Sequence, residues 1–204
     1  MWDDLEKPWQ IALKLAWQSF KSGSLPIAAV IVDGEGNIVA TGRNRITENH
    51  FKNRNMAHAE MDALMNLESD YHSDMRNYIM YTTLEPCPMC MGTIVMGDIR
   101  ILRIATRDPW AGAVDICKLP YIADKNLCIT FVDDTISTIY RVLYLYRLWE
   151  GYGTSGDRFL VRLKEHFPAE TAFAQELLAE KILRKHADDG ANIEEIYSYI
   201  ELKL

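Results

Sequence analysis

Two cysteines three positions apart are the residues of this chain whose types and spacing most clearly suggest chemistry. Cys87 and Cys90 lie in the segment PCPMC, and the tripeptide HAE at 58–60 lies upstream of them. A pair with this spacing can be a structural clip, a redox centre or half of a metal site. The chain has only 4 cysteines, too few for a disulfide scaffold, and a reducing compartment favours metal or catalytic use of a close pair.

The elements around the pair predict where the two sulfurs point. A strand ending at Leu84 and a helix beginning near Pro86 place Cys87 and Cys90 in the first helical turns. Residues three apart share one face of a helix, and a helix N-terminus lowers the pKa of a thiol there. Both sulfurs are therefore expected as thiolates, for which Zn²⁺ is the natural partner.

Two thiolates leave a tetrahedral site incomplete, and His58 is the candidate third ligand. A lone histidine at the start of a helix is more often a surface residue, but Glu60 two positions later favours a site. Residues i and i+2 point apart in a regular helix, so both can address one centre only where the chain enters the helix. Three protein ligands leave a fourth position open, as in catalytic zinc sites. Zinc lowers the pKa of bound water toward about 7, and Glu60, which is not a ligand, can move its proton.

The segments HAEMDALM at 58–65 and TTLEPCPMCMGTIVM at 82–96 resemble the zinc-dependent cytidine deaminase superfamily. They are most similar to its branch of tRNA adenosine deaminases, guanine deaminases and fungal-type cytosine deaminases, over roughly residues 8–133. The resemblance implies one Zn²⁺ per chain, held by His58, Cys87 and Cys90. It also implies that Glu60 takes a proton from water and passes it to the departing ammonia, and that the chain forms a homodimer.

The same resemblance implies a set of substrate contacts. It suggests Asn44 as a side chain that hydrogen-bonds the base, together with backbone groups at Ala59 and in the turn at 84–86. Pro26 lies in the segment LPIAAV, which resembles a pocket wall, although Ala28 stands where the family commonly has glycine. The loop at 107–115 occupies the place of a loop over the pocket, where Asp108 and Trp110 would contact the substrate, Trp110 by stacking on a base. A turn with a packed tryptophan is the alternative.

The order of elements predicts a three-layer α/β/α fold with a central mixed five-stranded sheet, as in cytidine deaminases. Apolar spacing and turn residues indicate helices at 8–20, 56–68 and 88–98 and strands on both sides of a turn at 33–37 and at 77–85, 99–108 and 127–134. The last strand reads as a compact buried type, and Cys117 and Cys128 read as small buried side chains without a role.

From residue 135 onward the pattern is helical, in segments at 135–151, 158–167, 169–186 and 193–204. We therefore expect a deaminase core domain at 1–134 and a helical C-terminal extension at 135–204 that packs on the core. The aromatic-rich stretch at 141–152 offers either a dimer surface or core packing.

Composition limits the classes of function. The net charge of −7 argues against a broad nucleic-acid surface, although the basic stretch at 42–55 could hold a phosphate. No apolar run reaches the roughly 18 residues of a membrane span, and the acidic N-terminus lacks the features of a secretory signal, so we expect a cytoplasmic protein. The favoured hypothesis is deamination of a free purine or pyrimidine base, nucleoside or related heterocycle. Wobble-adenosine deamination in tRNA is the alternative, and a non-catalytic zinc-stabilised interaction protein is the third.

Overall fold

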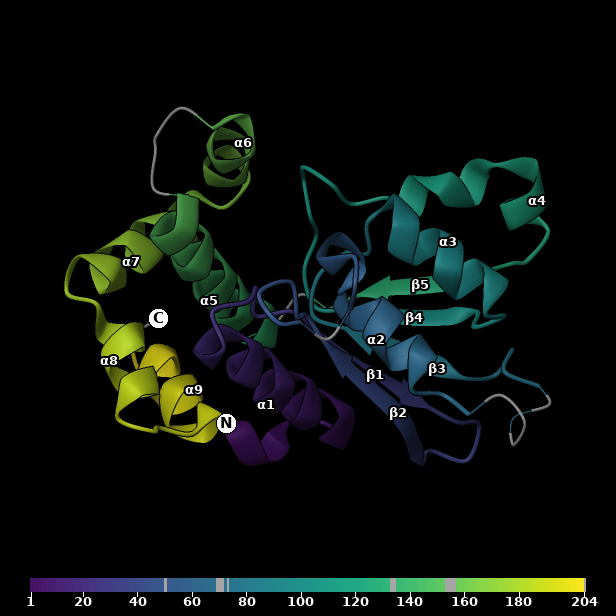
Figure 1. Ribbon diagram of the computed structural model, residues 1–204, viewed down its shortest axis with the longest axis horizontal. Coiled ribbons are helices and arrows are strands. Elements are labelled where there is room, and N and C mark those ends of the chain that lie inside the picture. Colours follow the sequence, from purple (N-terminus) through teal and green to yellow (C-terminus); the bar gives the residue numbers. More distant parts are fainter. Residues whose placement is uncertain (50, 69–71, 73, 133–134, 153–156, 204) are drawn as a thin grey trace.

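The computed structural model of the chain describes residues 1–49, 51–68, 72, 74–132, 135–152 and 157–203. A five-stranded sheet in the order β2-β1-β3-β4-β5 lies at its centre (Figure 1). β1 pairs antiparallel with β2 and with β3, whereas β3, β4 and β5 run parallel, which confirms the predicted mixed sheet. The strands are β1 (Ala28–Val32), β2 (Ile38–Arg43), β3 (Ile79–Thr82), β4 (Ile101–Ile104) and β5 (Cys128–Phe131).

Helices cover both faces of the sheet, as predicted. α1 (Lys7–Lys21) packs on one face, and α2 (Ala59–Met65) and α3 (Pro88–Met96) lie on the other (Figure 1). All 5 residues of β1 are buried, which an apolar central strand requires when both of its faces are covered. Short helical segments in the connections are η1 (Trp2–Asp4), η2 (Arg54–Met56), η4 (Val114–Lys118) and α4 (Pro120–Ala123).

The backbones of β2 and α2 touch at Gly42. A Cβ atom on this residue would overlap the amide nitrogen of Ala63 and the carbonyl oxygen of Ala59 and would lie 2.8 Å from the Ala63 Cα. Beside this contact, the buried Asp62 of α2 accepts a hydrogen bond from the backbone N–H of Arg43 at 3.0 Å. The position of α2 against the sheet therefore depends on the missing side chain at residue 42.

The helical C-terminal region predicted from the sequence is present and packs against α1 (Figure 1). Trp17 Nε1 in α1 donates to the carbonyl oxygen of Ala191 at 2.8 Å, and Arg147 Nε donates to that of Gly23 at 3.2 Å. The helices are α5 (Thr135–Tyr152), α6 (Arg158–His166), α7 (Pro168–Ala179), α8 (Ile182–Asp188) and α9 (Ile193–Glu201). The division at residue 134 stays a prediction, because 133–134 lie outside the described residues.

The structure bears on two surface properties: the exposure of the aromatic residues of α5, and whether any helix could cross a membrane. In the aromatic-rich stretch at 141–152, Tyr144 and Tyr146 are buried at 8 and 0% exposure, whereas Tyr152 at its end is 48% exposed. Within the described residues, no helix is both long enough and apolar enough to cross a membrane. The cytoplasmic location stays a prediction.

The sequence predictions were wrong in three places. β5 is not a buried strand: it lies at the edge of the sheet, where β4 is its one partner among the described residues, and it leaves Cys128 exposed. Cys117 is only partly buried. The helix expected over 169–186 is divided into α7 and α8, because Lys181 adopts a left-handed conformation with φ of 55°. That turn brings α8 back against α1.

Candidate active site

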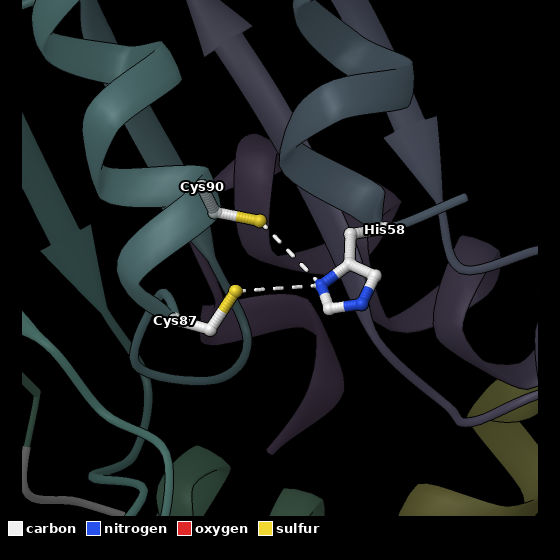
Figure 2. A group of neighbouring side chains, drawn as sticks. All are labelled: His58, Cys87 and Cys90. Carbon is white, nitrogen blue, oxygen red and sulfur yellow. Dashed lines mark hydrogen bonds between the residues drawn. The ribbon is translucent and has the colours of Figure 1, made fainter. Parts of the chain in front are cut away.

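Three potential metal ligands converge between the first turns of α2 and α3. Figure 2 shows the His58 ring with its Nδ1 atom directed at both sulfurs. The Nδ1 atom lies 3.7 Å from Cys87 Sγ and 3.5 Å from Cys90 Sγ. All the ligand atoms of the three residues lie within 4.8 Å of one another.

The local backbone explains this convergence. His58 is the N-cap of α2, with extended angles of −82° and 155°, and therefore stands outside the regular helix as the sequence argument required. Cys87 is the N-cap of α3, and Pro88 is the first helical residue, where the helix predicted at 88–98 begins. Cys87 therefore precedes the first helical turn and does not lie in it. Cys90 follows in the first turn of α3 and is fully buried.

The electrostatics of the cluster favour a thiolate at Cys87. Hydrogen bonding by Cys90 and by His58 lowers the pKa of the Cys87 thiol to about 4. The interaction with Cys87 in turn raises the pKa of the imidazole of His58 above its ordinary value. The proton of the cysteine pair stays on Cys90, whose pKa is raised by its hydrogen bond to Cys87 and by burial.

The donor set fits Zn²⁺. One imidazole nitrogen and two cysteine sulfurs are borderline and soft donors, which zinc accepts in tetrahedral sites, and a bound cation deprotonates coordinating thiols. His58, Cys87 and Cys90 supply three of four positions. This number is typical of catalytic zinc, since structural sites are closed by a fourth protein ligand.

Glu60 lies beside this cluster as a buried carboxylate with 3% exposure. The hydroxyl of Thr82 in β3 lies 3.0 Å from Glu60 Oε1 and 3.1 Å from the carbonyl oxygen of Leu84. Burial raises the pKa of Glu60 above its ordinary value, because desolvation disfavours the charged form. A carboxyl group with a raised pKa is suited to accept and release a proton near neutral pH.

A cavity of about 170 Å³ opens onto the cluster and receives most of the predicted substrate contacts. Asn44, Ala59, Asp108 and Trp110 line it, whereas Leu25 and Ile27 are the lining residues on either side of Pro26. The remaining side chains that line the cavity are His58, Glu60, Leu84, Glu85, Cys87, Ala111, Tyr144, Phe159 and Leu163. The roles of these residues toward a substrate stay predictions.

Asn44 is held firmly at the cavity by its backbone. Its N–H donates to the carbonyl oxygen of Ile27 at 2.8 Å, and its carbonyl oxygen accepts from the Ser19 hydroxyl at 2.8 Å. The side-chain Oδ1 accepts from the N–H of Ile46 at 3.3 Å. This bond assigns the amide orientation, and within the described part of the chain no protein group accepts from Nδ2.

Asp108 shapes the loop over the cavity. Its Oδ1 accepts from the N–H groups of Trp110 and Ala111 at 2.9 and 3.0 Å, which fixes the turn. The buried carboxylate of Glu85, which sequence reasoning missed, accepts from the N–H of Asp108 at 3.2 Å and from that of Val114 at 3.3 Å. The sequence signal that could have identified Glu85 was its position directly before the segment PCPMC.

Three further lining residues come from the C-terminal region. Tyr144 belongs to α5, and Phe159 and Leu163 belong to α6. Sequence reasoning missed them because an aromatic or leucine on an amphipathic helix is indistinguishable from a core residue until the packing is known.

Two of the four lysine and arginine side chains in the stretch at 42–55 are paired with carboxylates within the protein. Arg43 forms a two-point ion pair with Glu48, with N–O distances of 2.5 and 3.0 Å. Arg45 Nε lies 3.5 Å from the carboxylate of Asp62. These contacts leave less positive charge for a phosphate than the sequence suggested.

Comparison with known proteins agrees with this geometry. Residues 3–106 match the family described as the cytidine and deoxycytidylate deaminase zinc-binding region. A tRNA-specific adenosine deaminase of Haemophilus influenzae is 36% identical over 110 residues, which cover 53% of this chain and 62% of that protein. A cytosine deaminase of Candida albicans is 32% identical over 93 residues, covering 46% and 60%. The chain thus spans about three fifths of the length of these relatives.

Among solved structures, one comes from studies of A-to-I editing by tRNA:A34 deaminases at the wobble position of transfer RNA. It is 27% identical with a TM-score of 0.53, and the likeness covers 60% of this chain and 95% of that one. A guanine deaminase from Nitrosomonas europaea shares the fold at 19% identity and a TM-score of 0.51, covering 67% and 82%.

Proposed function

The chain belongs to the cytidine and deoxycytidylate deaminase zinc-binding family, and we propose that it is a hydrolytic deaminase of a nucleobase, nucleoside or related heterocycle. One observation carries the proposal: His58 and Cys87 of the cluster of potential metal ligands line the same small cavity as the buried carboxylate of Glu60. A structural zinc site in an interaction protein would need neither Glu60 nor a cavity beside the metal.

The proposed reaction replaces an exocyclic amine by oxygen. Water adds to the amino-bearing ring carbon, the C–N bond breaks, and ammonia leaves. Zinc, when bound by His58, Cys87 and Cys90, lowers the pKa of water to about 7. Glu60 accepts a proton from the attacking water and delivers it to the departing amine, a transfer for which its raised pKa is suited. Asn44 orients the ring edge.

The cavity supports a small substrate. Its volume of about 170 Å³ is below the roughly 300–1,000 Å³ of sites that hold drug-sized ligands. The net charge of −7 and the internal ion pairs of Arg43 and Arg45 give little support for binding many phosphates. We therefore favour a free base or nucleoside as substrate.

Wobble-adenosine deamination in tRNA is the second candidate. It is favoured by the similarity to the tRNA-specific adenosine deaminase of H. influenzae and to the wobble-position deaminase structure. Binding tRNA would require phosphate contacts from the exposed part of the stretch at 42–55, where Lys52 and Arg54 remain at the surface.

The deciding experiment measures ammonia release by the zinc-loaded protein from a panel of free bases and nucleosides, alongside inosine formation in tRNA. Ammonia from a base or nucleoside supports the first candidate, and inosine at the wobble position with no turnover of the small molecules supports the second. The Glu60→Gln variant serves as the matched blank in each assay. A zinc-loaded protein that turns over neither class of substrate would contradict the deaminase proposal.

We also propose a homodimer. Met65 in α2 and Met96 in α3 are 65% and 71% exposed, and Met96 borders an apolar groove with Leu64, Leu67 and Met75. Clustered apolar surface of this kind is typical of protein–protein interfaces. Light scattering should give about twice the chain mass of 23.4 kDa, and Met96→Glu should shift the protein toward the monomer.

A further inference from the structure

Part of the cavity wall is built by residues that lie after the end of the family match in the sequence. The match ends at residue 106, whereas Trp110 follows in the loop and Tyr144, Phe159 and Leu163 come from α5 and α6. We propose that α5 and α6 are part of the substrate-binding site and that Tyr144 selects the substrate by donating a hydrogen bond to a ring carbonyl oxygen. This inference rests on the proposed deaminase function and narrows its substrate class.

Tyr144 has the properties of a ligand-binding donor. Its side chain lines the cavity at only 8% exposure, and its ring stacks on that of Tyr140 with a centroid distance of 6.0 Å and an interplanar angle of 11°. Among the described residues, no protein group is hydrogen-bonded to its hydroxyl. Burial raises the pKa of this phenol well above its ordinary value, so it stays protonated. A rigidly held O–H without a partner therefore borders the cavity.

Asn44 supplies a second donor to the same cavity, because Oδ1 is engaged by Ile46 and Nδ2 is left without a described acceptor. When a ligand displaces water from the cavity, a donor left unpaired is costly. The ligand must therefore offer lone pairs in the plane of its ring. A ring carbonyl oxygen offers two and can accept from both donors, whereas an unprotonated ring nitrogen offers one and the amine to be removed offers none that is readily available.

The part of the wall formed by Trp110, Phe159 and Leu163 is apolar and aromatic. Leu163 is buried, and the Phe159 ring lies 6.5 Å from that of Trp110 between centroids. Planar apolar surfaces of this kind accept the faces of a heterocycle. Together with the two donors and the small volume, this wall fits an amino-oxo heterocycle of one or two rings better than adenine, whose ring nitrogens offer only one lone pair each.

The test uses pairs of bases that differ by the carbonyl oxygen and the ring N–H that accompanies it: cytosine with 4-aminopyrimidine, and guanine with 2-aminopurine. The full-length zinc-loaded wild type should prefer the oxo member of a pair. Tyr144→Phe keeps the ring and removes only the O–H, so kcat/KM for the oxo member should fall roughly 5- to 100-fold. For the member without oxygen it should change less than about twofold. An equal loss on both members, or no loss on either, would overturn the inference.

Tyr146→Phe is the matched control. Tyr146 is buried in the same helix, and its hydroxyl accepts from the N–H of Arg184 at 3.3 Å, away from the cavity. This variant should keep the wild-type ratio between the two members of each pair. Zinc content and melting temperature, measured for every variant, separate a lost contact from a misfolded protein. If Tyr146→Phe changes the ratio as much as Tyr144→Phe does, the assignment to Tyr144 fails.

Calorimetric titration separates this inference from the proposed activity. If the wild type releases no ammonia but binds cytosine or guanine, the deaminase proposal fails, and the affinity of Tyr144→Phe for the same base decides the inference. Weaker binding of the oxo base by Tyr144→Phe supports it, and unchanged binding overturns it. If none of the four bases binds or reacts with the wild type, the inference is overturned as well, because it commits to this class of ligand.

Discussion

The hydroxyl of Thr82 lies 3.0 Å from Glu60 Oε1, joining the end of β3 to the first turn of α2 inside the protein. Both side chains are buried, at 0% and 3% exposure. A buried carboxylate that rotated freely would transfer protons poorly, since catalytic groups need a fixed geometry. We therefore propose that Thr82 positions Glu60 for the proposed proton transfer.

Replacing Thr82 by valine should lower turnover without loss of metal. Valine keeps the shape of the side chain but leaves Glu60 Oε1 without this partner, and an unpaired buried acceptor costs about 1–3 kcal/mol. We expect kcat to fall about 10-fold, with zinc content unchanged by metal analysis. Thr130→Val on the exposed side of β5 is the control. Wild-type kcat in Thr82→Val would contradict the positioning role.

Glu60→Gln should separate metal binding from catalysis. Glutamine keeps the size of the side chain and cannot accept the proton, so turnover should fall by about 10²- to 10⁴-fold while zinc stays bound. The measurement is ammonia release per zinc, with the surface change Glu35→Gln as control. Full activity in Glu60→Gln would rule out Glu60 as the proton carrier.

Cys87→Ala should cost both metal and stability. Removing one of three protein ligands weakens zinc binding. Because zinc binds the folded protein, its binding free energy stabilises the fold, and weaker binding therefore lowers the free energy of unfolding. The melting temperature should fall for Cys87→Ala, and a chelator should lower that of the wild type in the same direction. Cys128→Ala, at an exposed cysteine, should behave like the wild type. A variant Cys87→Ala with one zinc per chain would refute the ligand assignment.

The sequence was sufficient to predict the elements near the metal cluster because their signals are local. His58 and Glu60 are two positions apart and the two cysteines are three positions apart, so the start of one helix fixes each group. The mixed sheet followed from the order of strands and helices. Only the packing of α2 on α3, a tertiary fact, was needed to bring the two groups together.

The part of the cavity wall formed by α5 and α6 could not be predicted, because it depends on tertiary packing and not on a local sequence signal. Tyr144 looks like any aromatic residue of a core-facing helix, and its neighbours Tyr140 and Tyr146 are indeed core residues. Which tyrosine meets the cavity depends on how α5 lies against the sheet. The edge position of β5 was missed similarly, since a short apolar strand reads the same at an edge as in the centre.

Gly42→Ala should displace α2 and with it the start of the helix that carries His58. The added Cβ would overlap the backbone at Ala59 and Ala63, which cannot move aside as a flexible side chain would. We expect a loss of several kcal/mol in unfolding free energy, on the scale of overpacking a core, and weaker zinc binding. Denaturant titration and metal analysis check both effects.

Gly92→Ala is the matched control for Gly42→Ala. Gly92 lies within α3, and among the described residues no atom outside its own helix and chain neighbours lies within 4 Å of an added Cβ. Alanine should therefore stabilise α3 by about 0.5–1 kcal/mol. If Gly42→Ala were as stable as Gly92→Ala, the close approach of β2 and α2 would not be required.

Asp108→Asn should make the protein more stable at neutral pH, and the gain in stability should shrink as the pH falls. Burial raises the pKa of Asp108 in the folded state above its ordinary value of 3.8, so the ionised form is disfavoured by folding. The cost is therefore complete above the folded pKa and disappears as the pH falls below 3.8. Asparagine removes the charge, and its Oδ1 can still accept from Trp110 and Ala111.

The measurement is the difference in melting temperature between Asp108→Asn and the wild type, at pH values from 7.5 down to 4. Taking the difference cancels effects common to both proteins, including protonation of the metal ligands at low pH. The variant should melt roughly 1–3 °C higher at pH 7.5, and the advantage should shrink as the pH falls. Asp3→Asn, at an exposed position, should show no such trend. An advantage that grew toward low pH would mean that the Asp108 carboxylate stabilises the loop as an anion, contrary to the desolvation argument.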